Sequence, residues 1–301
     1  MKPWAIQTIK SKRLLGVSPV KRGNPKYTTL RGKLYWMLVE LCKSARGGYM
    51  YSSEKEALVA ACIDSALDKA EMHWQNGGQE LLYKSIAGNE EFIRAESAPS
   101  SIPGHKIVQD EKTVIDEFIA LVADMRDSSK HLNCAIDAKV TQLQRVFYET
   151  SALLPALAMT IKFEEGSVTE YLGDGVLALF KVDKSDKSKA IYAAYEAARN
   201  CVHQTRELVN RALESRYDLP NIDLGVGLAH SKAIVTLVGL SGEKHPKAFG
   251  ECVFRATKLS NGKNEIYIDQ FVKGLWPTSQ GGTLRFIQKK RNDIDGYLIS
   301  K

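Results

Sequence analysis

The sequence lacks the features that mark secreted, zinc-binding or membrane-spanning proteins. Its 301 residues include five cysteines, an odd number at wide spacings without a C-x-x-C pair, which argues against a disulfide framework or a zinc site. No run approaches the ~20 apolar residues that a membrane-spanning helix needs. The basic N-terminus has no apolar segment behind it, so it is not a secretory signal. We therefore expect a cytoplasmic protein in a reducing compartment, with no membrane partner.

Acidic residues are nearly missing from the start of the chain. Residues 1–46 carry eleven Lys or Arg and a single acid, Glu40, so this segment has a formal charge of +10 in a chain of +7. A basic segment is typical of contacts with nucleic acid or an anionic membrane, and also of a solvated leader. We expect no nucleic-acid partner and infer that the segment packs on the rest of the chain or aids dimerisation.

Two regions lie on either side of a loop rich in Pro, Ser and Gly, from Ala95 to Gly104. Before the loop, apolar positions repeat at helical spacing over 30–43 and 53–74. After it, helical patterns cover 137–159, with a kink or break at Pro155, 185–217 and 254–259. Strand patterns cover 118–123, 161–171, 175–182, 222–228, 233–238, 264–268, 284–288 and 296–299. We therefore predict a basic leader and small helical region over 1–111, and over 112–301 an α+β domain with the βαββαβ order of a ferredoxin-like sandwich.

Two aspartates stand at the ends of predicted strands. Asp124 closes an apolar strand and precedes a Ser-rich helix start, where a carboxylate can bind Mg²⁺ and backbone N–H groups can hold phosphate oxygens. A helix N-cap is the alternative. Asp174 lies in a Gly-Asp-Gly turn between two apolar segments, which alone predicts only a hairpin. At the ends of adjacent strands, the two carboxylates would form a negative site that needs a cation.

Four blocks, in this order, resemble the class III nucleotide cyclases over about 190 residues. That family has one metal-binding Asp at a strand end and a second in a Gly-Asp hairpin; here the two are 50 residues apart. Glycine-containing strand blocks follow at 227–231 and 236–239, then an aromatic-Gly-x-x-Val block at 249–253 and a basic strand at 289–291. The resemblance implies a ferredoxin-like sandwich of the class III cyclase type.

The resemblance also implies a two-metal reaction that converts a nucleoside triphosphate to a 3′,5′-cyclic nucleotide and pyrophosphate. Asp124, Asp174 and the backbone carbonyl of Met125 would hold two Mg²⁺ or Mn²⁺ ions. Groups in the turn after the first aspartate and in the basic strand would bind substrate phosphates: Arg126, Ser128, Lys289 and Arg291. For the last two, a solvated basic strand is the alternative. Because the family builds its site between two such domains, we expect a homodimer with the site at the interface.

Positions that the family uses for base recognition and transition-state stabilisation differ in this chain. The base-reading positions hold Glu170, which is the guanylate-type residue, and Lys247, which is of neither purine type. Exposed loop charges are the alternative for both. Phe254 replaces the transition-state Asn, and Lys258 replaces the Arg. Arg255 is a candidate for the lost charge stabilisation, unless Phe254 is core and Arg255 a surface charge.

The chain lacks a complete adenylate or guanylate base-reading pair. In this it resembles the Pycsar-type pyrimidine cyclases, which make cyclic UMP or cyclic CMP in anti-phage defence. We therefore expect UTP or CTP as the substrate. One alternative is a guanylate or adenylate cyclase, favoured on the guanylate side by Glu170 and Phe249. Another is a degenerate cyclase fold that binds a nucleotide without turnover, favoured by Phe254.

Overall fold

The computed structural model describes residues 52–75, 97–109, 113–133, 139–240, 243–278 and 282–300. The chain divides into two compact units after Ser44, and all described residues belong to the second unit. The predicted basic leader over 1–46 and the predicted helix over 30–43 lie outside the described residues. The domain boundary after residue 111 stays a prediction.

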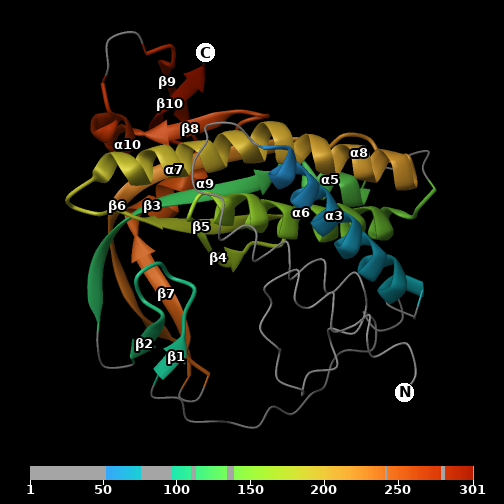
Figure 1. Ribbon diagram of the computed structural model, residues 1–301, viewed down its shortest axis with the longest axis horizontal. Helices are drawn as coiled ribbons and strands as arrows, with labels where there is room; N and C mark the ends of the chain where they lie inside the picture. The colour runs from blue at the N-terminus through green and yellow to red at the C-terminus, as the bar shows by residue number, and fades with distance from the viewer. Residues whose placement is uncertain are drawn as a thin grey trace, which may run out of the picture. The chain divides into compact units, whose positions relative to one another are not determined.

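An eight-stranded mixed sheet forms the centre of the second unit, with strand order β4-β5-β3-β6-β8-β10-β9 and with β7 paired to β6 (Figure 1). β3 pairs antiparallel with both β5 and β6, and β4 pairs antiparallel with β5, whereas β6 and β8 are parallel. Together with the helices after β3 and β5 they give the βαββαβ order, so the predicted α+β, ferredoxin-like fold is confirmed. The bounds are β3 Val114–Met125, β4 Ser167–Tyr171, β5 Gly175–Lys181, β6 Leu224–Val238, β7 His245–Gly250, β8 Ile266–Asp269, β9 Arg285–Arg291 and β10 Ile294–Ser300.

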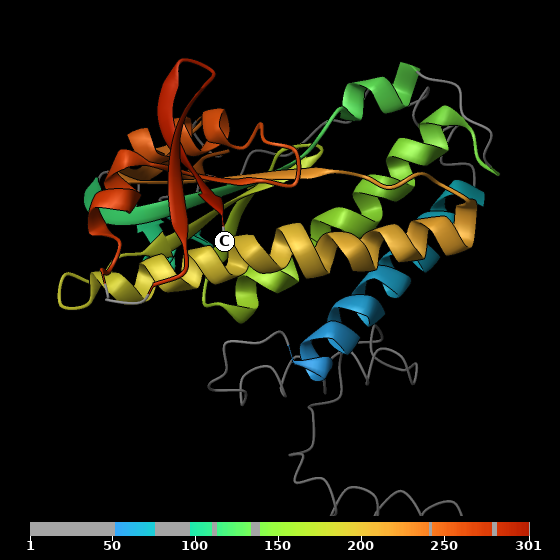
Figure 2. The ribbon, with the colours of Figure 1, turned by 90° about the horizontal axis from the view of Figure 1, so that it is seen from above.

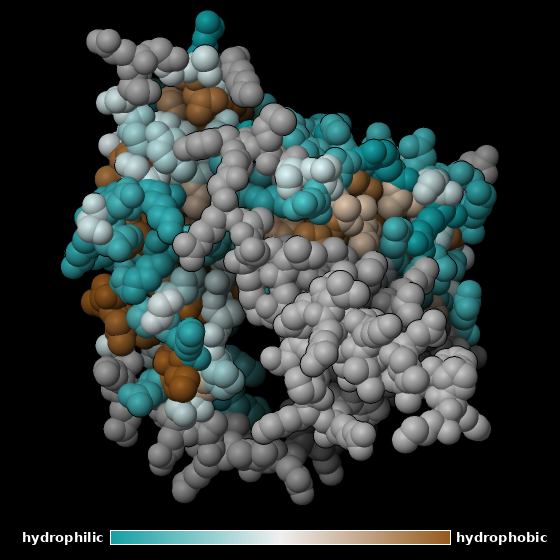
Figure 3. All heavy atoms as spheres, viewed as in Figure 1, coloured by the Kyte–Doolittle hydropathy of each residue, from teal (hydrophilic) through white to brown (hydrophobic). Residues whose placement is uncertain are grey.

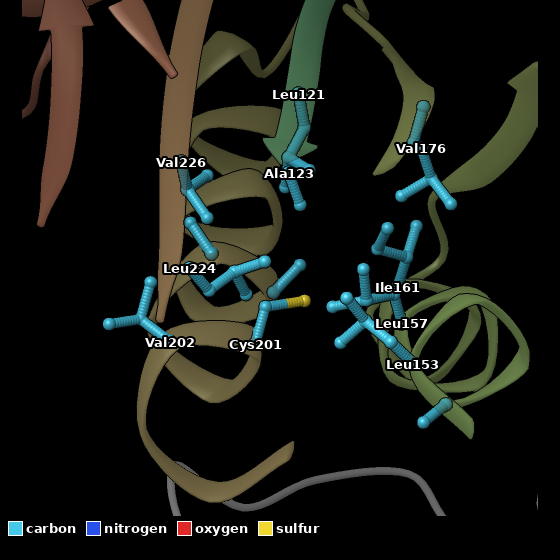
Figure 4. Close-up of a cluster of buried hydrophobic side chains, with 14 of the residues drawn as sticks. Leu121, Ala123, Leu153, Leu157, Ile161, Val176, Cys201, Val202, Leu224 and Val226 are labelled. Carbon is cyan, nitrogen blue, oxygen red and sulfur yellow. The ribbon is translucent and has the colours of Figure 1, made fainter. Parts of the chain in front are cut away.

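Helices cover one face of this sheet: α6 (Gln142–Phe163), α7 (Lys187–Asn200), the π-helical turn η3 (Cys201–Thr205) and α8 (Arg206–Tyr217). Alternate residues of β3, namely Ile119, Leu121 and Ala123, point toward them and are fully buried. Figure 4 shows side chains of β3, β5 and β6 facing Leu153, Leu157 and Ile161 of α6. This packing forms the larger of two hydrophobic cores.

The opposite face of the sheet is covered by α9 (Glu251–Leu259) and by a small hairpin of β1 (Ser97–Pro99) and β2 (Ile107–Gln109). The other alternate residues of β3, Phe118, Ala120 and Val122, pack on this side. Asp124 continues their alternation, so it belongs to the face that carries α9. The remaining short helices are α5 (Ser128–Asn133) and α10 (Gln270–Leu275).

Helix α3 (Ser53–His73) runs across α6 and α8 (Figure 2). The Arg216 guanidinium of α8 contacts three acids of α3, at 2.9 Å from Asp64, 3.0 Å from Asp68 and 3.2 Å from Glu71. In the described part of the chain, no helix is both long and apolar enough to cross a membrane. Cys62, Cys201 and Cys252 are buried free thiols.

Several predicted boundaries are wrong, because distant contacts override local patterns. The two strands expected at 222–228 and 233–238 are one strand, β6. Its polar middle is stabilised by partners elsewhere: His230 contacts Glu117 at 2.8 Å, and the Ser231 hydroxyl accepts from the Cys252 N–H at 2.9 Å. Pro155 lies inside α6 without ending it, since buried Leu153 and Leu157 pack on either side. The strand expected from residue 161 begins at Ser167, because the preceding residues complete α6.

Candidate active site

Asp124 and Asp174 meet at the ends of β3 and β5. Asp124 pairs with Gly175 across the sheet, and the Met125 N–H donates to the Asp174 carbonyl at 3.1 Å. A Cβ at Gly175 would lie 2.4 Å from the Ala123 carbonyl oxygen, so only glycine permits this close approach. The Gly-Asp-Gly pattern therefore does more than turn the chain: it brings the two carboxylates to one place.

The electrostatics of this pair favour a cation. Burial, followed by the charge of nearby Asp174, raises the pKa of the Asp124 carboxyl to about 6, although Arg126 opposes the shift. The two carboxylates are hard oxygen donors, which suit Mg²⁺ or Mn²⁺. No group of three or more His, Cys, Asp or Glu with ligand geometry occurs among the described residues. The oxygen chemistry of the two carboxylates fits the predicted metals.

Two side chains from the turn after β3 contact these carboxylates. Arg126 Nη1 lies 2.9 Å from Asp124 Oδ2, and the Ser128 hydroxyl donates a hydrogen bond to the Asp174 carboxylate. The Arg126 N–H donates to the Asp223 carbonyl at 2.8 Å, which ties the turn to the segment before β6. The two predicted phosphate ligands therefore stand beside the two predicted metal ligands, and in this state they bind those carboxylates.

A buried ionic cluster holds α5, which follows this turn, against α6. Glu149 has no exposed surface; it lies 2.8 Å from Arg145 Nε and 2.7 Å from His131 Nδ1. Arg145 is itself buried. Sequence reasoning missed this support for the site. In the sequence, this cluster is indicated only by Arg145 and Glu149, four residues apart in a helix whose neighbouring apolar side chains are buried.

Glu170 and Lys247 form an ion pair between β4 and β7. The Lys247 ammonium lies 2.7 Å from the Glu170 carboxylate, and both side chains are about one-third exposed. β4 and β7 are not neighbours in the sheet, so this ion pair links two strands that share no main-chain hydrogen bonds. The two predicted base-reading residues therefore form one unit, with a hydrogen-bond donor beside an acceptor.

On α9, the predicted transition-state residues lie on different sides. Phe254 is 61% exposed, and the Lys258 ammonium lies over its ring at 5.6 Å from the centroid. Arg255 instead contacts Glu251, stacks over Phe271 at 4.5 Å, and stands 3.6 Å from the buried carboxylate of Asp269. The alternative of a core Phe254 and a surface Arg255 is thus the reverse of what is observed.

The basic strand β9 lies far from the carboxylate pair within one chain. Three strands, β6, β8 and β10, separate β9 from β3, which is roughly 19 Å at about 4.8 Å per strand. Lys289 is exposed, whereas Arg291 is held by Glu265 at 2.9 Å and by the Tyr267 hydroxyl at 2.7 Å. One chain does not bring the predicted phosphate lysine to the predicted metals.

An exposed apolar row crosses the β6–β7 end of the sheet. Ile115 pairs with Ile234, and Ile234 pairs with Phe249, so the three side chains line up across β3, β6 and β7. Their exposed fractions are 64%, 42% and 52%. Figure 3 shows hydrophobic surface in this part of the molecule.

Solved structures of cyclases share this fold. The guanylyl cyclase Cya2 matches with a TM-score of 0.50 and 19% identity, over 62% of this chain and 91% of that one. The adenylyl cyclase CyaB from P. aeruginosa matches with a TM-score of 0.50 and 13% identity, over 63% of this chain and 96% of that one. The chain therefore has the fold of class III cyclase catalytic domains. No protein-family model and no curated protein matches it.

Proposed function

We propose that the protein is a nucleotide cyclase that converts UTP or CTP to the 3′,5′-cyclic monophosphate and pyrophosphate. The observation that carries the proposal is the meeting of Asp124 and Asp174 at adjacent strand ends within a cyclase fold. A buried carboxyl whose pKa is raised by a second carboxylate is stabilised when a cation binds between them. A role in anti-phage defence would follow from a cyclic pyrimidine product.

In this proposal Asp124, Asp174 and the carbonyl of Met125 hold two Mg²⁺ or Mn²⁺ ions. When bound, the ions supply the charge that activates the 3′-hydroxyl and stabilises the leaving pyrophosphate. Arg126 and Ser128 leave the carboxylates and bind phosphate oxygens instead, because their donors already point into this space. Charge on the α-phosphate is stabilised by Lys258, which is on the exposed side of α9, in preference to Arg255, which is engaged with Asp269 and Phe271.

The proposed enzyme is a homodimer. The separation of β9 from β3 supports this, because Lys289 of one chain reaches the carboxylates only if they belong to a second chain. The exposed row of Ile115, Ile234 and Phe249 supports it as well, since apolar surface of this kind is typical of protein contacts. Sedimentation of the purified protein tests the state directly; a monomer that retains full activity would contradict the shared site.

Base choice rests on the Glu170–Lys247 pair. A carboxylate beside an ammonium offers an acceptor and a donor, which matches the N–H and carbonyl of uracil or the amino group and ring nitrogen of cytosine. The adenylate and guanylate pairs are both incomplete, which favours a pyrimidine. Guanine presents a similar donor and acceptor, so a guanylate cyclase is the second candidate, favoured by Glu170.

The test is a panel of the four nucleoside triphosphates with Mn²⁺, with the products identified by mass spectrometry. We expect cyclic UMP or cyclic CMP from the wild type and none from Asp124→Ala or Asp174→Ala. Glu207→Ala, an exposed acid on α8, serves as the matched control and should retain activity. A product from GTP or ATP alone would contradict the pyrimidine assignment. Tight nucleotide binding without turnover would favour a degenerate, nucleotide-binding cyclase fold.

A further inference from the structure

A cavity of about 330 Å³ lies where the β1–β2 hairpin meets β4 and β7. Its lining comes from three separate segments: Pro99 at the end of β1 with Ser100 and Ser101 after it, Thr169 of β4, and His245, Pro246 and Lys247 of β7. Small-molecule pockets in proteins typically measure about 300–1,000 Å³. A cavity of this size suits the base end of a nucleotide rather than a whole nucleoside triphosphate.

The hairpin that forms one wall is fixed to the sheet. Ala98, Ile102 and Val108 are buried in the second core, against residues of β3, β5 and β6. His105 Nε2 lies 3.1 Å from Asp116 of β3, and this carboxylate also contacts Lys181 of β5. The wall therefore has a defined position and does not depend on a ligand to order it.

The polar groups of the cavity leave one hydroxyl unused. The Ser100 hydroxyl accepts from the Ile102 N–H at 3.0 Å, and the Thr169 hydroxyl donates to the Leu177 carbonyl. No hydrogen bond of the Ser101 hydroxyl is found within the described part of the chain. Lys247 belongs to the lining, and its ammonium is paired with Glu170. The exposed Ser101 hydroxyl thus lines the same cavity as Lys247, whose ion-pair partner Glu170 lies just outside the lining.

We propose that the β1–β2 hairpin is one wall of the nucleobase subsite, and that Ser101 is a specificity-determining residue. The base enters the cavity between Ser101 and Lys247, with its polar edge toward the Glu170–Lys247 pair and the Ser101 hydroxyl available to a ring carbonyl. With the hairpin as one wall, the cavity measures about 330 Å³, which favours a one-ring base. This inference rests on the proposed function, because it assigns the base half of that substrate.

The test compares two tryptophan substitutions on the same hairpin. Ser101→Trp fills the cavity, whereas Gln109→Trp, at an exposed position of β2 outside the cavity, leaves it open. Measured with the preferred triphosphate and Mn²⁺, Ser101→Trp should raise KM at least tenfold. Inhibition by pyrophosphate, which reports only the phosphate half of the site, should change less than twofold. Gln109→Trp should match the wild type in both, and equal melting temperatures would show that all three proteins are folded.

A milder change tests the role of the hydroxyl. Ser101→Ala should alter the ratio of kcat/KM for UTP to that for CTP by threefold or more, because the two bases differ in the edge that they present. Unchanged KM in Ser101→Trp together with an unchanged ratio in Ser101→Ala would overturn the hairpin proposal and leave the cyclase proposal intact. If the wild type makes no cyclic product, the proposed function fails. Calorimetric binding of UTP to wild type and Ser101→Trp then decides the subsite, and equal affinity or no binding would overturn it.

Discussion

Arg126 Nη1 lies 2.9 Å from the carboxylate of Asp124, at the point where β3 ends and the chain turns into α5. The guanidinium thus neutralises one of two carboxylates that would otherwise repel each other. A cation that binds the pair takes over this task and frees Arg126 for the substrate. The relationship links metal binding, phosphate binding and stability in one small region.

Replacing Arg126 by alanine separates these roles. We expect Arg126→Ala to raise KM for the nucleoside triphosphate by about 10- to 100-fold, the size expected for one charge-assisted hydrogen bond. The variant should bind Mn²⁺ at least as tightly as the wild type, because no side chain competes for Asp124. Steady-state kinetics and Mn²⁺ titration measure the two effects. Lys130→Ala is the control, since the ammonium of this neighbouring residue pairs with the exposed carboxylate of Asp127; equal KM in both variants would contradict the assignment.

The raised pKa of Asp124 predicts a stability that depends on pH. A carboxyl whose folded pKa lies at about 6, above its ordinary value of 3.8, favours folding below pH 3.8 and loses that contribution as pH rises through 6. Without metal, Asp124→Asn should therefore increase the free energy of unfolding at pH 7.5 by about 1–3 kcal/mol. The gain should vanish near pH 4. Urea unfolding at both pH values gives the comparison, and Mn²⁺ should stabilise only the wild type at pH 7.5. A pH-independent difference would contradict the shift.

Two cations of α9 should behave differently when removed. Lys258→Ala should lower kcat by about 100-fold, in the range seen when a transition-state donor is lost, with little change in melting temperature. Arg255→Ala should instead reduce the free energy of unfolding by about 1–3 kcal/mol, because the buried carboxylate of Asp269 loses its cation. Kinetics and thermal unfolding of both variants decide the roles. A large loss of kcat in an Arg255→Ala variant that remains stable would instead assign transition-state stabilisation to Arg255.

Gly175 should be intolerant of any side chain. Gly175→Ala would place a Cβ 2.4 Å from the Ala123 carbonyl oxygen and 3.1 Å from the Asp124 Cα. Because strand backbone cannot move aside cheaply, we expect a loss of about 1–3 kcal/mol in the free energy of unfolding. The matched control is Gly274→Ala in α10, where a Cβ would meet nothing within 4 Å and should be neutral or slightly stabilising. Chemical denaturation compares the two, and equal effects would refute the steric argument.

The sequence by itself determined the order of the elements and the position of the carboxylate pair. The βαββαβ order could be predicted because short continuous apolar runs mark β3 and β5, while apolar residues recur at helical spacing in α6 and α8. Asp124 and Asp174 could be found because each interrupts such a pattern where a strand ends. These are local signals, and local periodicity is what a single sequence records well.

Only the tertiary structure decided which distant side chains meet. The β1–β2 hairpin lies in a segment that its Pro, Ser and Gly content marks as a loop, and it becomes ordered because Ala98, Ile102 and Val108 find a sheet face to cover. The Glu170–Lys247 pair joins two residues that are 77 positions apart in the chain. Arg255 turns inward toward the buried carboxylate of Asp269, the residue that caps α10. Each of these contacts joins residues that are far apart in the sequence, so no local sequence pattern predicts it.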